Sequence, residues 1–345
     1  MNNNPTMLKR LISAMPKAEL HMHIEGSLEP AMIFELAQRN KITLPYPDVE
    51  ALKQAYEFTD LQSFLDVYYA GTGVLIESED FYDMAMAYFE RAEQDNVVHA
   101  EIFFDPQSHL SRGVAFETMM QGFTQAKQDA YQRWGITSDY IMCFLRHLSE
   151  QEAFETLELA LPWRDHFIGV GLDSSERGHP PEKFVQVFAA CREAGLRVVA
   201  HAGEEGPAQY VRDAIDLLKS ERIDHGVRSI DDADLVAHLV HTQIPLTVCP
   251  LSNVKLGVYA HMSEHVLPEL LSKGVKVLIN SDDPAYFGGY MNQNFHSLFE
   301  AHPTLTPQHA YQLARNSFEA SFAEPELIAA WVKRLDAVWV EHQAG

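Results

Sequence analysis

Two histidines one residue apart, His21 and His23, follow an apolar run near the N-terminus and constrain the fold more than any other feature of the chain. Successive side chains of a β-strand point to opposite faces, so residues i and i+2 project to the same side. Two imidazoles on one side can bind one metal ion, since neutral imidazole is a common metal ligand. The pattern predicts a strand over 18–24 whose end carries two metal ligands.

Three later polar segments also follow apolar runs and supply the ligands that such a metal lacks. They are His201-Ala202-Gly203-Glu204, Asp224-His225-Gly226 and Ser281-Asp282-Asp283-Pro284. Three nitrogens and one oxygen suit Zn²⁺, with Fe²⁺ or Mn²⁺ as neighbouring alternatives, and a water beside the ion would lose a proton more easily, toward a pKa of about 7. We expect one metal ion per subunit. The predicted ligands are His21, His23, His201 and Asp282.

Eight apolar, β-branched runs indicate the fold class. They lie at 18–24, 97–104, 139–145, 167–172, 197–201, 222–225, 245–249 and 276–280. From the fourth onward they recur about every 25 to 30 residues, and most intervals hold one amphipathic helix, as in repeated βα units. Because the polar motifs follow strands, where barrel enzymes place their chemistry, we predict an α/β fold, a TIM (β/α)₈ barrel. A doubly wound open sheet is the alternative, but no glycine-rich phosphate loop follows any strand.

The first connection, about 27–96, is far longer than one helix requires. It contains helical patterns at 29–39, 61–69 and 81–94. We expect this helical insertion to fold over the barrel mouth as a partial lid. No composition break or linker divides the chain, so we expect one domain over 1–345.

Charge and cysteine content narrow the partners and the compartment. The formal charge of −23 repels nucleic-acid backbones and anionic membranes, and no basic stripe offsets it. Apolar runs are short, and Met1-Asn2-Asn3-Asn4-Pro5 lacks a signal-peptide pattern. Cys143, Cys191 and Cys249 each lie in an apolar stretch, which favours buried thiols over a disulfide framework. We expect a cytoplasmic protein that binds neither nucleic acid nor membrane; the sequence does not decide between a monomer and a homo-oligomer.

Residues beside the predicted ligands indicate catalysis. Glu204 lies three positions after His201, where it can approach the metal water or a substrate without ligating. His225 and Asp283 add an imidazole and a carboxylate that could orient or deprotonate the nucleophile. Taken singly, Glu204 reads as a solvated loop acid and His225 as a packed strand end. Together they are the predicted catalytic residues.

Five ordered motifs cover nearly the whole chain. They are His21-Met22-His23-Ile24-Glu25-Gly26, His201-Ala202-Gly203-Glu204, Asp224-His225-Gly226, Val248-Cys249-Pro250-Leu251-Ser252-Asn253 and Asn280-Ser281-Asp282-Asp283-Pro284. The set resembles the adenosine/adenine deaminase branch of the amidohydrolase superfamily. The resemblance implies one zinc ion on the four predicted ligands, with Glu204 protonating purine N1 while His225 and Asp283 position and activate the hydroxide that attacks C6. Relatives with two metals use a modified lysine at strand 4, and the run 168–176 has no lysine.

The resemblance also bears on the substrate. Adenosine deaminases typically carry an Asp after His-x-His, contacting the ribose, and a Gly-Asp-Glu at the end of strand 4, where this chain has Glu25 and Ser174-Ser175-Glu176. Glu25 would encroach on a ribose subsite and offer an acceptor to a free imidazole-ring N–H. With Phe104-Asp105-Pro106-Gln107-Ser108-His109, these features look like adenine deaminases, which implies hydrolysis of adenine to hypoxanthine and ammonia in purine salvage. The predicted substrate contacts are Asp283, Glu25, Ser174, Glu176 and Gly203.

Other activities stay open at this point. Deamination of adenosine to inosine is the alternative within the family. An N6-substituted adenine nucleotide is a further substrate class, although no phosphate-binding arginine cluster stands out. A catalytically silent barrel that binds purine or metal could keep the histidines while losing Glu204 or His225, so the presence of both residues favours an enzyme.

Overall fold

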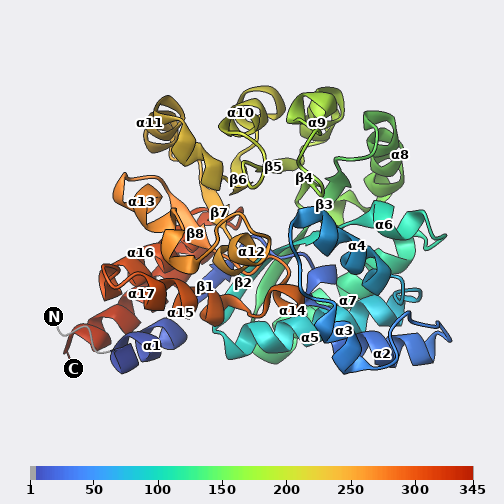
Figure 1. The fold of residues 1–345 in the computed structure, drawn as a ribbon, viewed down its shortest axis with the longest axis horizontal. Coiled ribbons are helices and arrows are strands. Elements are labelled where there is room, and N and C mark those ends of the chain that lie inside the picture. The colour runs from blue at the N-terminus through green and yellow to red at the C-terminus, as the bar shows by residue number, and fades with distance from the viewer. Residues whose placement is uncertain (1–4, 345) are drawn as a thin grey trace.

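The computed structural model describes residues 5–344, which form a barrel of parallel strands surrounded by helices (Figure 1). Neighbouring strands follow chain order, and every neighbouring pair is parallel. The strands are β1 (Lys17–Glu19), β2 (Val97–Phe104), β3 (Thr137–Leu145), β4 (Gly169–Asp173), β5 (Arg197–Ala202), β6 (Arg222–His225), β7 (Leu246–Val248) and β8 (Val277–Ile279). The predicted TIM barrel is confirmed. The expectations for the extreme ends, residues 1–4 and 345, lie outside the described residues.

Helices cover the outside of the barrel and extend beyond its ends. They are α1 (Pro5–Ala14), α2 (Pro30–Arg39), α3 (Val49–Gln54), α4 (Leu61–Thr72), α5 (Ser78–Gln94), α6 (Pro106–Leu110), α7 (Phe116–Trp134), α8 (Glu150–Ala160), α9 (Val185–Glu193), α10 (Ala208–Asp213), α11 (Ala233–Thr242), α12 (Pro250–Lys255), α13 (Leu267–Ser272), α14 (Pro284–Phe287), α15 (Met291–Ala301), α16 (Pro307–Glu319) and α17 (Pro325–Ala344). The sequence specifies their ends and inner faces locally. In α11, Asp232 caps the first turn by accepting from the backbone N–H of Leu235, and Leu235 and Leu239 are buried against the core.

The first strand is shorter than the predicted 18–24, because regular pairing stops at Glu19. The backbone N–H of Leu20 donates to Asn280 Oδ1 at 2.8 Å. A side-chain amide thus takes the place of a backbone partner, and the ladder is interrupted at this point.

Backbone hydrogen bonds beyond this interruption close the barrel between β8 and β1. Met22 forms an isolated parallel bridge with Asp282. His23 N–H donates to Asp282 O at 2.9 Å, and Asp282 N–H donates to His21 O at 3.1 Å. The residues predicted to bind the metal are therefore also those whose backbones join the first and last strands.

The helical insertion predicted after the first strand is present as α2 to α5, of which the short α3 had no counterpart among the predicted patterns. Arg112, which follows α6, holds the C-terminal end of α4. Its Nη2 donates to Thr72 O at 3.2 Å and its Nη1 donates to Gly73 O at 3.1 Å. The end of α4 is thereby tied to the loop after β2.

The thiols of Cys143, Cys191 and Cys249 are buried and free, as expected. Among residues 5–344, no helix combines the length and the apolar character needed to span a bilayer.

A buried ion pair crosses the barrel interior. Arg222 of β6 donates from Nη1 to Glu101 Oε2 of β2 at 2.6 Å, and both side chains are fully buried. Arg222 Nη2 also donates to Leu20 O at 3.3 Å, while Phe322 N–H donates to Glu101 Oε1 at 2.5 Å. These bonds connect opposite sides of the barrel to the segment that leads into the histidine pair.

We predict that Arg222→Met lowers the free energy of unfolding by about 3–5 kcal/mol, because it leaves the buried Glu101 carboxylate without the arginine that balances its charge. Urea denaturation followed by circular dichroism measures this change. The double variant Arg222→Met/Glu101→Leu should recover much of the loss, since no buried charge remains. As a control, Arg197→Met removes only a partly exposed pair with Glu221 and should cost far less. Equal losses in the two single variants would contradict the prediction.

Candidate metal centre and active site

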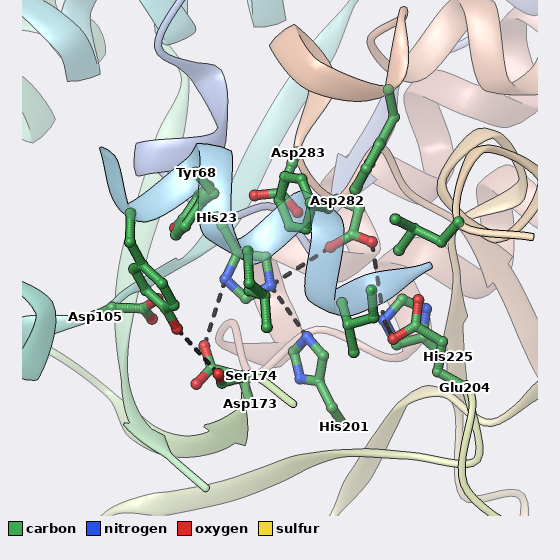
Figure 2. Close-up of a pocket in the computed structure, with 16 residues that line it drawn as sticks. His23, Tyr68, Asp105, Asp173, Ser174, His201, Glu204, His225, Asp282 and Asp283 are labelled. Carbon is green, nitrogen blue, oxygen red and sulfur yellow. Dashed lines mark hydrogen bonds and ion pairs between the residues drawn. The ribbon is translucent and has the colours of Figure 1, made fainter. Parts of the chain in front are cut away.

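The four predicted metal ligands converge at the carboxyl ends of the strands. Figure 2 shows three of them, His23, His201 and Asp282. His201 is the penultimate residue of β5, and Asp282 follows β8. His23 Nε2 lies 3.0 Å from His201 Nε2. Asp282 Oδ1 lies 3.1 Å from His21 Nε2 and 3.5 Å from His23 Nε2. One donor atom from each of the four buried residues lies within 4.8 Å of the others.

The tautomer of His21 leaves a lone pair pointing into this cluster. His21 Nδ1 lies 3.0 Å from Thr247 O, which can only accept, so Nδ1 carries the hydrogen. Its Nε2 is therefore unprotonated in the neutral ring, and it is buried without a hydrogen-bond partner despite its proximity to Asp282. Buried polar atoms are normally paired, so an atom of this kind calls for an explanation. A cation among the four donors provides one.

Carboxylates stand behind the other two imidazoles. His201 Nδ1 lies 3.4 Å from Asp224 Oδ2, and His23 Nδ1 lies 3.6 Å from Asp173 Oδ2. A carboxylate that faces one ring nitrogen directs the lone pair of the other toward a metal. The residues present therefore fit a divalent cation held by three imidazole nitrogens and one carboxylate oxygen.

The electrostatics of the cluster suit metal binding. Burial lowers the pKa of His23 well below its ordinary value, and the neighbouring His201 lowers it further. Burial acts to raise the pKa of Asp282, but the imidazoles, led by His21, hold that pKa well below its usual range. A metal site requires neutral imidazoles beside an ionised carboxylate, and the shifts of His23 and Asp282 favour that state. The pKa of His21 moves the other way, because burial acts to lower it but the neighbouring groups, led by Asp282, outweigh that effect and raise it.

A second, overlapping set of buried donors shares two residues with the first and consists of His21, His225, Cys249 and Asp282. Burial raises the pKa of the Cys249 thiol well above its ordinary value, and Asp282 raises it further. Because the thiolate is the form that binds metal, this shift disfavours the second set.

The predicted catalytic residues lie beside the first set, as Figure 2 shows. His225 Nε2 lies 3.6 Å from Glu204 Oε2 and 3.8 Å from Asp282 Oδ2. Burial raises the pKa of Glu204 well above its ordinary value, and Asp282 adds to the effect. Burial and Asp282 likewise raise the pKa of Asp283. The shift of Glu204 favours its protonated form, in which a carboxyl group is able to donate a proton.

These side chains line one small cavity of about 40 Å³. The helix α4 supplies much of its apolar wall, through Leu61, Phe64, Leu65, Tyr68 and Tyr69. On the side of His23 away from Glu204, Figure 2 places Asp105 and Asp173. The cavity thus has a metal-ligand region, an apolar wall and an acidic end.

Three of the residues lining the cavity have positive φ, a conformation uncommon for residues other than glycine. The angles are 72° at Ser174, 64° at His225 and 67° at Asp282. Such backbone strain persists where the surroundings over-determine the conformation and clusters at functional sites. The strained residues are Ser174, directly after β4, His225, the last residue of β6, and Asp282, shortly after β8.

Of the predicted substrate contacts, Asp283 and Ser174 line the cavity, whereas Glu25, Glu176 and Gly203 lie outside its lining. The Glu176 carboxylate instead accepts from four consecutive backbone N–H groups. The donors are those of Gly203 at 2.6 Å, Glu204 at 3.0 Å, Glu205 at 2.9 Å and Gly206 at 2.8 Å. Glu176 therefore holds the loop that carries Glu204.

Glu25 lies behind Asp105, a cavity residue that the sequence analysis did not single out. Glu25 Oε1 accepts from Asp105 N–H at 3.2 Å and from His109 Nε2–H at 2.9 Å. Asp105 follows β2 and Asp173 ends β4. The rule that drew attention to His201, a polar side chain at the carboxyl end of a strand, would also have found these two aspartates.

A (β/α)₈ barrel with this centre at its strand ends is an amidohydrolase-type barrel. The sequence profile of the adenosine deaminase family matches residues 16–338, so the chain belongs to that family. Adenine deaminase of Geotalea uraniireducens (strain Rf4) is 60% identical over 336 residues, which are 97% of this chain and 95% of that protein.

Solved structures of similar proteins have the same fold. An adenine deaminase from Arthrobacter aurescens is 50% identical with a TM-score of 0.93, covering 95% of this chain and 100% of that one. An amidohydrolase from Burkhoderia ambifaria with bound Zn is 26% identical with a TM-score of 0.90, covering 100% of this chain and 96% of that one.

We predict that His201→Ala lowers the metal content from about one ion per chain to well below that value, because a ligand is lost. Plasma mass spectrometry after gel filtration measures the ratio. His225→Gln should retain the metal, since His225 belongs only to the second donor set. If His225→Gln lost the metal and His201→Ala kept it, the second set would be the metal site.

Proposed function

We propose that this chain is a zinc-dependent adenine deaminase that hydrolyses adenine to hypoxanthine and ammonia. One observation carries the proposal: the buried carboxyl of Glu204 faces His225 in a cavity that is also lined by three of the four convergent metal donors, all but His21. The identity of 60% to a protein named adenine deaminase, over 97% of the chain, supports the choice of substrate. Deamination of adenosine is the alternative.

In the proposed reaction His21, His23, His201 and Asp282 hold Zn²⁺. When bound, the metal activates water as a nucleophile at neutral pH. Glu204 donates its proton to purine N1, which makes C6 electrophilic. His225 and Asp283 hold the attacking water on the face of C6 nearest the metal ligands. As the water oxygen adds to C6, the water loses both of its protons. One passes to the amino group, which leaves as ammonia when its bond to C6 breaks, and the other restores the Glu204 carboxyl, so that hypoxanthine remains and atoms and charge balance.

The acidic end of the cavity favours a free base over a nucleoside. Asp105 Oδ1 and Asp173 Oδ1 are both buried without a hydrogen-bond partner. A free purine base carries an imidazole-ring N–H that can donate to such an oxygen, whereas the sugar replaces that hydrogen in a nucleoside. We assign this contact to Asp105 and Asp173 rather than to Glu25, whose Oε1 is occupied by His109 and the Asp105 backbone.

Metal identity and compartment complete the proposal. Three imidazoles and one carboxylate suit Zn²⁺, and Fe²⁺ or Mn²⁺ are the alternatives that metal supply would decide. The free, buried cysteines suit a reducing compartment, and we place the reaction in the cytoplasm.

We predict that kcat/KM for adenine exceeds that for adenosine by more than about 100-fold, because a site built around an N–H donor rejects the analogue that lacks it. Ultraviolet absorbance of the zinc-loaded enzyme with adenine, adenosine and 6-substituted purines measures the ratio. Comparable values for base and nucleoside would contradict the assignment to adenine.

We also predict that Glu204→Gln reduces kcat by about 100-fold or more while the metal content stays unchanged, since the amide cannot protonate N1. The matched control is Glu205→Gln in the same loop, whose side chain lies outside the cavity lining and should leave kcat within a few-fold. Equal activities of the two variants would remove Glu204 from the chemistry.

A further inference from the structure

Behind His225, a chain of hydrogen bonds that the proposed reaction does not use leads away from the cavity. Asn253, in α12, places Nδ2 3.3 Å from His225 Nδ1. Its Oδ1 lies 3.2 Å from His265 Nε2, and His265 Nδ1 lies 3.1 Å from the backbone nitrogen of Leu267, where α13 begins. All four residues are buried.

The outer end of this chain sets the direction of every hydrogen bond in it. The backbone N–H of Leu267 can only donate, so His265 Nδ1 accepts and the ring hydrogen lies on Nε2. Burial, with His302 nearby, lowers the pKa of His265 to about 3, which keeps the ring neutral at physiological pH. His265 Nε2–H then donates to Asn253 Oδ1, and the Asn253 amide donates from Nδ2 to His225 Nδ1.

We propose that His265 and Asn253 are positioning residues that hold His225 in the tautomer with its hydrogen on Nε2. The inference rests on the proposed function, because Nε2 is the atom that faces the reaction, 3.6 Å from Glu204 Oε2. His225 therefore acts as a hydrogen-bond donor that orients water and does not take a proton from it. Of the two roles open from the sequence, orientation or deprotonation, the network selects orientation.

The same tautomer bears on the metal. With Nδ1 accepting from Asn253 and Nε2 protonated, His225 has no free lone pair to offer a cation. This agrees with the donor set of His21, His23, His201 and Asp282 over the set that contains His225.

Backbone hydrogen bonds hold the main chain of Asn253 in place. Asn253 N–H donates to Cys249 O at 3.0 Å, and Tyr259 N–H donates to Asn253 O at 3.1 Å. The ring of Tyr259 packs against His265 with centroids 4.8 Å apart. The motif 248–253, to which the sequence analysis assigned no role, thus ends in the residue that contacts His225.

The decisive variant is Asn253→Asp. A carboxylate of the same shape still accepts from His265 Nε2–H but has no hydrogen for His225, so Nδ1 of His225 must become the donor. We expect kcat to fall by about 100-fold with KM within about threefold, and the metal content and melting temperature to stay near those of the native enzyme. An unchanged kcat would overturn the positioning role.

The tautomer itself is read by ¹⁵N NMR of the zinc-loaded enzyme labelled at histidine, with His225 assigned by the signals missing in His225→Gln. We expect hydrogen on Nε2 alone in the native enzyme and a hydrogen on Nδ1 in Asn253→Asp. A native His225 protonated at Nδ1 would overturn the proposal. The nitrogen shifts need no turnover, so they decide the tautomer even if adenine proves not to be the substrate.

A second pair of variants separates hydrogen bonding from packing. His265→Gln keeps one donor and one acceptor and should retain kcat within about fivefold, whereas His265→Phe removes both and should lose at least about tenfold. Equal losses in the two variants would reduce His265 to a packing residue and overturn its place in the network.

Discussion

The site depends on four buried groups whose lone pairs meet in one cluster at the carboxyl ends of the strands. The clearest case is His21 Nε2, whose lone pair is exposed to the cluster because the other ring nitrogen donates to Thr247 O. Leaving such atoms unpaired in a low-dielectric interior is costly, and a cation removes that cost. The closure of the barrel through the backbones of His23 and Asp282 keeps the donors together.

Each reactive side chain is held by a neighbour on another element. Asp224 stands behind His201, Glu176 holds the loop of Glu204, and Asn253 orients His225. These contacts restrict rotamers and ring tautomers, so the groups are set before substrate arrives, which is the arrangement that catalysis by positioning and electrostatics requires. Burial has a second effect, since it raises the pKa of Glu204 and lowers that of His23.

Much of the fold could be predicted because strand order follows chain order and each βα unit is specified locally by periodicity and caps. The four residues of the candidate metal site could be singled out for the same reason, since they follow apolar runs. The length of β1 could not be predicted, because it depends on the side chain of Asn280, which lies far away in the chain. The place of Glu176 could not be predicted either, because the four N–H groups it accepts from belong to a loop after a different strand.

The barrel, the donor types of the candidate metal site and the predicted acid beside it could all be inferred from the amino-acid sequence, because they follow from residue type and from position relative to strands. The folded structure determines which polar residues line the cavity and which lie behind that lining and hydrogen-bond to it. Asp105 reaches the cavity while Glu25 lies behind it, although both follow strands. The tertiary structure also sets the tautomer of His225. The end group of a hydrogen-bond chain fixes its direction, and here that group is the backbone N–H of Leu267, which can only donate.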